Sequence, residues 1–294
     1  MSRKPETVVP LRRRPSMLDG VPEVPMPLAT PAVSPVRPVS AGPAIDLSDR
    51  PKVWFVIGPG GAGKTTYAKW LTWRMMDQGR EAFLAALDPT NRSLAGWFDG
   101  VEQPPSRDTA HSARWLREFL EHLMAEKSAA IMDFGGGDTA LHRTADAAPD
   151  LIETLETSGL AVVAAYLFTP RIDDLAVLQT LEAAGLQPRA TLLLLNEGRA
   201  DPTLPATEAF AAITRHSIFR KAVSRGALPI WLPALESDVM AEIEAKRLHY
   251  GIARDGQVPE GASFPPIGGL RRSMVGRWLQ RMEQAHEPVQ SWLP

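Results

Sequence analysis

A glycine-rich segment directly after a short apolar run carries the residues best suited to chemistry. Residues 58–66 read Gly-Pro-Gly-Gly-Ala-Gly-Lys-Thr-Thr and satisfy the spacing G-x-x-x-x-G-K-[ST] in full. Glycines let successive backbone N–H groups curl around phosphate groups, and a lysine adds a point charge for the terminal phosphate oxygens. The flanking strand and helix patterns disfavour a chance glycine-rich turn. We therefore predict a phosphate-binding loop with these binding residues: Gly60, Gly61, Ala62, Gly63, Lys64, Thr65 and Thr66.

A bound triphosphate also needs a metal ion, and two residue types in this sequence suit one. The hydroxyl of Thr65 can ligate Mg²⁺, and Asp133 follows the apolar run 129–132, where it would hold the water shell of the metal. The alternative for an aspartate here is a cap of the next helix, which suits Asp138 better. Glycines 135–137 predict a loop that could respond to the terminal phosphate.

Two further polar residues follow apolar runs. Asp88 comes after residues 82–87, where it could position the attacking water, and a turn-forming Asp-Pro is an equally good interpretation. Asn196 comes after residues 191–195 and could hydrogen-bond a base, or serve as a turn residue at the end of a strand. The Asn-Lys-x-Asp pattern typical of a guanine site is absent at this position.

Short apolar runs that alternate with helical patterns must position these residues. The runs are continuous rather than alternating, which is typical of strands covered on both faces. We expect strands at 53–57, 82–87, 129–132, 160–168, 191–195 and 228–232. Helical periods fall near 66–77, 115–124 and 175–181, the last ended by Gly185. Strands that alternate with helices predict an α/β fold with a mostly parallel central sheet.

Composition narrows the possible classes of protein. The chain has 294 residues, 32 Lys plus Arg and 34 Asp plus Glu, so it is neither an acidic tail protein nor a basic nucleic-acid coat. It has no cysteine, which excludes disulfides, thiolate metal sites and cysteine nucleophiles. The first 51 residues hold 11 of the 27 prolines and no aromatic residue, so we expect residues 1–51 to be a disordered proline-rich arm. A cytoplasmic location is the default expectation.

At these residues the sequence resembles the ParA/MinD family of deviant Walker ATPases. The shared elements are residues 60–66, Asp88-Pro89, Asp133, Asn196 and the segment 231–233. The resemblance covers about residues 52–250 and implies the three-layer P-loop NTPase sandwich, with ATP and Mg²⁺ as ligands. It implies that Lys64 and Asp88 are catalytic, that Thr65 and Asp133 serve the metal, and that Asn196 and Pro233 contact the nucleotide. The family also implies a nucleotide-dependent homodimer and a role in plasmid partition, stability or conjugal transfer.

One position departs from the family. The signature lysine that precedes the two glycines is replaced by Pro59, so its contribution to hydrolysis across a dimer is missing. Arg92 is our candidate substitute. Two functions remain as alternatives to an ATP-hydrolysing switch. One is a nucleotide-gated adaptor with little turnover, and the other is a small-molecule P-loop kinase, although no arginine-rich lid insertion is visible.

Two surfaces could bind partners. Basic residues before the last strand could contact DNA phosphates, or could form a solvated helix face; these residues are Arg215, His216, Arg220, Lys221 and Arg225. Residues 251–294 form a C-terminal loop and an amphipathic helix, whose apolar stripe includes Val275, Trp278 and Met282. We expect that stripe to pack on its own domain rather than on a membrane. The partner of the N-terminal arm is not predicted.

Overall fold

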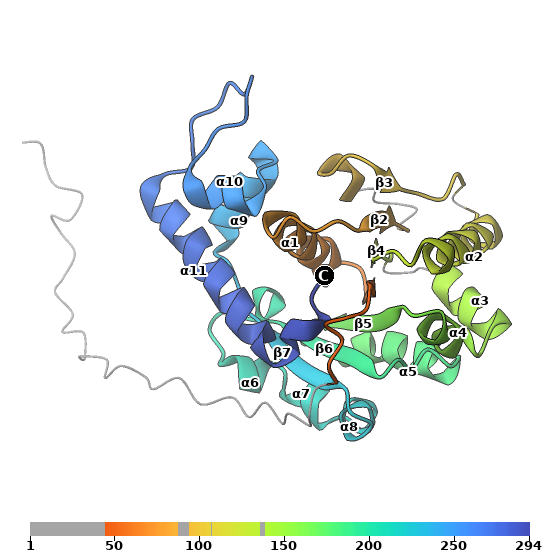
Figure 1. Ribbon diagram of the computed structural model, residues 1–294. Coiled ribbons are helices and arrows are strands. Elements are labelled where there is room, and N and C mark those ends of the chain that lie inside the picture. The colour runs from red at the N-terminus through yellow and green to blue at the C-terminus, as the bar shows by residue number, and fades with distance from the viewer. Residues whose placement is uncertain (1–44, 88–93, 107, 136–138) are drawn as a thin grey trace, which may run out of the picture. The chain divides into compact units, whose positions relative to one another are not determined.

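A seven-stranded parallel sheet forms the middle layer of the protein in the computed structural model (Figure 1). The structure describes residues 45–87, 94–106, 108–135 and 139–294. The strands are β1 (Lys52–Ile57), β2 (Phe83–Ala86), β3 (Val101–Glu102), β4 (Ala130–Asp133), β5 (Ala161–Phe168), β6 (Ala190–Asn196) and β7 (Leu228–Leu232). They lie in the order β3-β2-β4-β1-β5-β6-β7, and every neighbouring pair is parallel. The predicted three-layer α/β class is confirmed.

Helices cover both faces of this sheet (Figure 1). One face carries α1 (Lys64–Asp77), α9 (Ser237–Lys246), α10 (Tyr250–Asp255) and α11 (Gly269–His286). The other carries α2 (Thr109–Glu126), α3 (Ala140–Ala147), α4 (Leu151–Thr157), α5 (Leu175–Ala183), α7 (Ala211–Arg215) and α8 (Ser217–Ser224). The short elements are α6 (Ala206–Ala209), η1 (Leu94–Gly96), η2 (Ile172–Asp174), η3 (Glu197–Arg199) and η4 (Glu287–Trp292).

The central strand β1 is continuously apolar because both of its faces are buried. Trp54 and Val56 point into the core beneath α1, whereas Val53, Phe55 and Ile57 point into the core beneath α2 to α5. Successive side chains on a strand face opposite sides, so a strand covered on both faces needs an apolar residue at each position. Strand β7 pairs with β6 alone among the described strands, and this edge position tolerates Pro229.

The two ends of the described chain meet at the start of β1. The indole N–H of Trp292 donates to the carbonyl of Ile45 at 2.7 Å, and the indole N–H of Trp54 donates to the carbonyl of Trp292 at 3.0 Å. Leu47 is buried in the same core. Residues 45–51, which we assigned to the arm, are therefore packed against the domain, because the side chains of Ile45 and Leu47 contribute to its apolar core. The rest of the arm, residues 1–44, lies outside the described residues.

Most of the expected helices extend further in the structure than the apolar pattern from which we predicted them. Helix α2 begins after Asp108, whose carboxylate accepts hydrogen bonds from the N–H groups of Ala110 and His111. Helix α5 ends shortly before Gly185, which has a φ of 91° and lets the chain reverse. Within the described part of the chain, no helix is long and apolar enough to span a bilayer.

Candidate functional site

The predicted phosphate-binding loop lies between the end of β1 and the start of α1, at the carboxyl edge of the sheet. Strands β4 and β5 flank β1, so residues that follow these strands also lie at this edge. Gly63 has a φ of 96°, in the left-handed region, and directly precedes the first residue of α1. The N–H groups at the start of α1 therefore face the loop, where the helix dipole favours an anion.

Lys64, Thr65 and Asp133 come together at the start of α1. The hydroxyl of Thr65 donates to Oδ2 of Asp133 at 2.7 Å, and Asp133 is 3% exposed at the end of β4. The ammonium of Lys64 donates to the carbonyl of Pro59 at 2.8 Å across the loop. A hydroxyl and a carboxylate in contact suit a magnesium ion that is completed by phosphate oxygens and water. The residues present thus fit the metal that the sequence implies.

Asn196 lies against the loop from the end of β6. Its Nδ2 donates to the carbonyl of Ala62 at 2.7 Å, and its Oδ1 accepts from the N–H of Gly198 at 3.0 Å. A Cβ atom at Gly63 would lie 2.4 Å from Nδ2 of Asn196, so the fit is tight on both sides. The amide that we expected to contact the base thus holds the loop in this structure.

A cavity of about 320 Å³ opens beside the loop and α1. Gly63, Thr66, Asn196 and Pro233, which we expected to contact a nucleotide, line one part of it. Its other lining residues, which sequence reasoning missed, come mostly from α9, α11 and the segment that follows β7; they include Leu235, Met240, Glu244, Trp278 and Met282. The indole N–H of Trp278 donates to the carbonyl of Pro233 at 2.9 Å and fixes that segment. The size and the mixed lining suit a nucleoside.

A buried lysine links α1 to the wall of this cavity. Lys69 is 4% exposed, and its Nζ lies 2.8 and 3.1 Å from the two carboxylate oxygens of Glu244. The same Nζ lies 3.7 Å from the ring centroid of Trp97, an attractive cation–π contact. Burial lowers the pKa of Lys69, and the hydrogen bond with Glu244 opposes this shift. The spacing of these residues gives no signal in the sequence.

A second cavity, of about 670 Å³, lies on the Pro59 side of the loop. Pro59, Gly60 and Gly61 line it together with Arg171 and Arg199. Asp174 fixes the turn that carries Arg171, because its carboxylate accepts from the N–H and the hydroxyl of Thr169 at 2.7 and 2.6 Å. Asp173 and Asp201 also line this cavity, so its charge is mixed. Two arginines thus lie on the side of the loop from which the signature lysine is missing.

Several expected site residues lie outside the described part of the chain. They are Asp88, Pro89, Arg92, Gly136, Gly137 and Asp138. The expected positions of Asp88 as the water-activating residue and of Arg92 as the substitute cation stay predictions.

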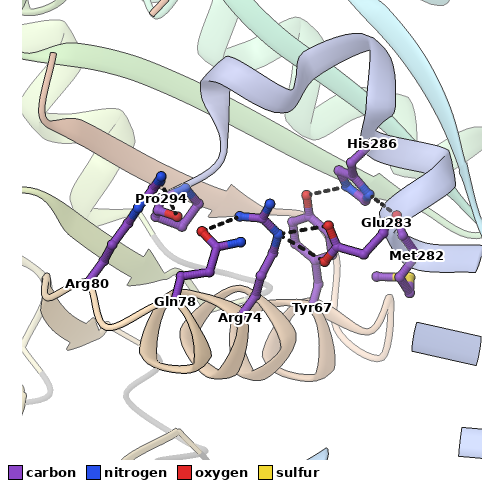
Figure 2. Close-up of polar contacts among 8 residues, drawn as sticks. All are labelled: Tyr67, Arg74, Gln78, Arg80, Met282, Glu283, His286 and Pro294. Atoms are coloured by element: carbon purple, nitrogen blue, oxygen red, sulfur yellow. Dashed lines mark hydrogen bonds and ion pairs between the residues drawn. The ribbon is translucent and has the colours of Figure 1, made fainter. Parts of the chain in front are cut away.

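Helix α1 also contacts the C-terminal helix through buried polar groups (Figure 2). The hydroxyl of Tyr67 lies 2.8 Å from Nε2 of His286, and Nδ1 of His286 lies 2.8 Å from the carbonyl of Met282. A carbonyl only accepts, so Nδ1 carries the proton and Nε2 accepts from Tyr67. Burial lowers the pKa of His286 to about 4, so the ring is neutral. Nearby, Arg74 donates from Nε to both oxygens of Glu283 at 2.9 and 3.0 Å.

The basic residues expected to contact DNA divide into two groups. Arg215, Arg220 and Lys221 are exposed on α7 and α8. Arg225 instead forms an ion pair with Glu182 of α5. The apolar stripe of α11 packs in the core beneath α1 and β7, as expected, with Val275, Trp278, Leu279 and Met282 buried.

Comparisons with known proteins give likenesses of fold only. No protein-family model matches the chain, and no curated protein matches it. Among solved structures, chloroplast FtsY from Physcomitrella patens is 15% identical, with a TM-score of 0.42 over 66% of this chain and 62% of that one. The chain thus spans less than two thirds of the length of that structure. Cell division protein FtsY from Thermotoga maritima is 14% identical, with a TM-score of 0.42 over 82% and 73% of the two chains.

A third solved structure is a nucleotide-binding protein in complex with ADP from Archaeoglobus fulgidus. It is 14% identical, with a TM-score of 0.38 over 67% of this chain and 87% of that one. At these values the likeness concerns the general arrangement of strands and helices, and the function must be argued from the site itself.

Proposed function

We propose that this protein is a Mg²⁺-dependent molecular switch that binds and hydrolyses ATP. The observation that supports this proposal best is the contact between the Thr65 hydroxyl and Asp133, directly beside Lys64 and a nucleoside-sized cavity. Lys64 would exchange the carbonyl of Pro59 for phosphate oxygens, and the N–H groups of Gly60 to Thr66 would surround the phosphates. Thr65 and Asp133 would hold the magnesium ion, which neutralises phosphate charge when bound.

The assignment of the remaining roles rests on the sequence. Asp88 would position the attacking water, and Pro233 would contact the nucleoside from the wall of the cavity. Asn196 would act on the nucleotide indirectly, because it holds the carbonyl of Ala62. By its resemblance to ParA/MinD proteins, the switch would serve plasmid partition, stability or conjugal transfer.

Nucleotide binding and phosphate release by purified protein test this proposal. We expect Mg²⁺-dependent ATP binding in the wild type, and a loss of at least about 100-fold in affinity in Lys64→Gln, because the charged partner of the phosphates is removed. Lys127→Gln, at an exposed lysine that ends α2, is the matched control and should bind as the wild type does. If the wild type does not bind ATP, the proposal is wrong.

Pro59 favours a second candidate, a nucleotide-gated adaptor with little turnover. A proline supplies neither an ammonium group nor a backbone N–H for phosphate. Tight ATP binding without phosphate release would support the adaptor over the hydrolase. Phosphate transfer to an added acceptor without free phosphate would instead support a small-molecule kinase.

The exposed basic residues of α7 and α8 favour DNA as a partner of the ATP-bound form. Arg215, Arg220 and Lys221 face solvent and would neutralise backbone phosphates without reading sequence. Replacing Arg220 and Lys221 by alanine should weaken duplex binding and reduce the slope of log K against log salt by about 2. The size of the protein with ATP and with ADP tests for the homodimer in the same samples. An unchanged salt slope would show that these residues do not contact DNA phosphates.

A further inference from the structure

Glu244 presents a carboxylate to the cavity beside the phosphate-binding loop. It lies in the third turn of α9, its side chain is 41% exposed, and it lines the same cavity as Thr66, Asn196 and Pro233. This cavity is where the base of a nucleotide would lie if its phosphates occupied the loop. A carboxylate accepts hydrogen bonds and donates none, so its position bears on which base is bound.

An ion pair with Lys69 fixes the orientation of the Glu244 carboxylate. Nζ of Lys69 contacts both oxygens, at 2.8 and 3.1 Å, and is itself held over the ring of Trp97 at 3.7 Å. Because Lys69 is 4% exposed, the ion pair keeps its orientation better than a pair on the surface would. The oxygens of Glu244 retain lone pairs that Lys69 does not occupy.

Three other polar groups around the cavity are engaged within the protein, whereas the side chains of Arg199 and Ser237 also line it. The amide of Asn196 bonds to Ala62 and Gly198, the hydroxyl of Tyr67 bonds to His286, and the carbonyl of Pro233 accepts from Trp278. Among the described residues that line this cavity, Glu244 is the one carboxylate, and a carboxylate is the strongest acceptor for a base amino group.

We propose that Glu244 accepts a hydrogen bond from the exocyclic amino group of adenine and so selects ATP over purine nucleotides that lack this group. This inference rests on the proposed nucleotide-binding function and adds to it the residue that specifies the base. Hypoxanthine carries an oxygen in place of the amino group, and that oxygen would face the carboxylate unfavourably. Guanine carries the same oxygen at this position, which would face the carboxylate unfavourably in the same orientation.

Affinities for ATP, ITP, GTP and purine riboside triphosphate, which lacks the amino group, test the inference. In the wild type we expect ATP to bind at least about tenfold more tightly than each of the other three, the range typical of a hydrogen bond to a charged group. This comparison requires no variant, so it does not depend on the folding of a mutant. Equal affinities, or a preference for GTP, would overturn the inference.

The variant Glu244→Gln tests whether Glu244 causes the preference for ATP. The carbonyl oxygen of the new glutamine can still accept from Lys69, so the amide NH₂ would point toward the base. This NH₂ would repel the amino group of adenine and would donate to the oxygen of hypoxanthine. We expect the ATP-to-ITP preference to fall at least tenfold. Glu242→Gln is the matched control, because Glu242 pairs with Lys246 and with Arg271 but does not line the cavity. An unchanged preference in Glu244→Gln would overturn the assignment.

The two proposals fail in different ways. If the wild type binds none of these nucleotides, the proposed function itself is wrong. If it binds them with a Lys64-dependent affinity but without base preference, only the role of Glu244 is wrong. Trp97 provides a second readout, since the ammonium of Lys69 lies over its ring. ATP should change the fluorescence of the wild type more than that of Trp97→Phe, and ITP should produce a smaller change than ATP.

Discussion

Gly63 packs closely against the side chain of Asn196 at the phosphate-binding loop. Gly63 has a φ of 96°, and a Cβ atom at this position would lie only 2.4 Å from Nδ2 of Asn196, so there is no room for any other residue. By contrast, Gly60 has nothing within 4 Å of the equivalent position. The fold therefore requires glycine at Gly63. At Gly60 no protein atom requires it, and the absent side chain leaves room for a ligand to approach the backbone.

Gly63→Ala should lower the free energy of unfolding by about 2–3 kcal/mol, through left-handed backbone strain and the loss of the bond between Asn196 and Ala62. It should also abolish ATP binding, because the loop must move. Gly60→Ala should change stability by less than about 1 kcal/mol. Denaturant unfolding and ATP titration of both variants check this, and equal stability losses would contradict it.

Thr65 and Thr72 lie on the same helix and allow a matched comparison. The hydroxyl of Thr65 donates to Asp133, whereas the buried hydroxyl of Thr72 has no hydrogen-bond partner among the described residues. Thr65→Val should cost about 1–3 kcal/mol of stability and remove the Mg²⁺ dependence of ATP binding. Thr72→Val should be neutral or stabilising. Thermal unfolding with and without Mg²⁺ measures both effects, and a neutral Thr65→Val would argue against the metal site.

At the residue scale, the sequence predicted site residues that belong to the loop motif or directly follow an apolar run. The loop residues follow one another, so their spacing alone predicted a phosphate site, and the structure brings Thr65 into contact with Asp133. Glu244 and Lys69 are 175 residues apart, and Tyr67 and His286 are 219 apart. Neither pair has a periodic or motif signature, so only the packing of α9 and α11 against α1 reveals them.

Helix α1 connects the site to the rest of the protein. Its first turn carries Lys64 and Thr65, its second turn carries Lys69, and it contacts α11 through Tyr67 and Arg74 (Figure 2). Helix α11 thus contacts the same helix whose first turn follows the phosphate-binding loop. The apolar residues of α11 were correctly assigned to the core from sequence, but the buried polar contacts that join this helix to α1 were not predicted.

His286 should make stability depend on pH. Its pKa is about 4 in the folded protein, against 6.5 when solvated, so between these values the unfolded chain binds a proton that the folded chain does not. The free energy of unfolding should therefore fall as pH falls from about 6.5 to 4, by up to about 3 kcal/mol. In His286→Gln this part of the slope should vanish, whereas His111→Gln, at an exposed histidine, should retain it. Denaturant unfolding across this range measures the slope.

At the scale of elements, the strands were predicted better than the connections. Continuous apolar runs located six strands, because burial on both faces requires them. Strand β3 was missed, since Val101–Glu102 is too short to show a pattern. The order of the strands also gave no signal in the sequence, because it is set by which helices pack on which face.

For the whole molecule, the C-terminal residues complete the core beneath α1. Trp292 is fully buried and bonds to both Ile45 and Trp54. Trp292→Ala should lower the free energy of unfolding by about 3–5 kcal/mol, because it leaves a cavity and unpaired groups. Leu270→Ala, at a side chain that is 75% exposed, should change it by less than about 0.5 kcal/mol. Similar losses in both variants would show that the C-terminal segment is not part of the core.

The meeting of Ile45 and Trp292 has a practical consequence for measurements on this protein. Trp292 contacts Trp54 in the first half of β1 and Ile45 contacts Trp292, whereas the phosphate-binding loop follows the end of this strand. A dye or surface tether attached through either end of the folded body should therefore leave nucleotide access unhindered. Immobilised and free protein should then give the same dissociation constant for ATP.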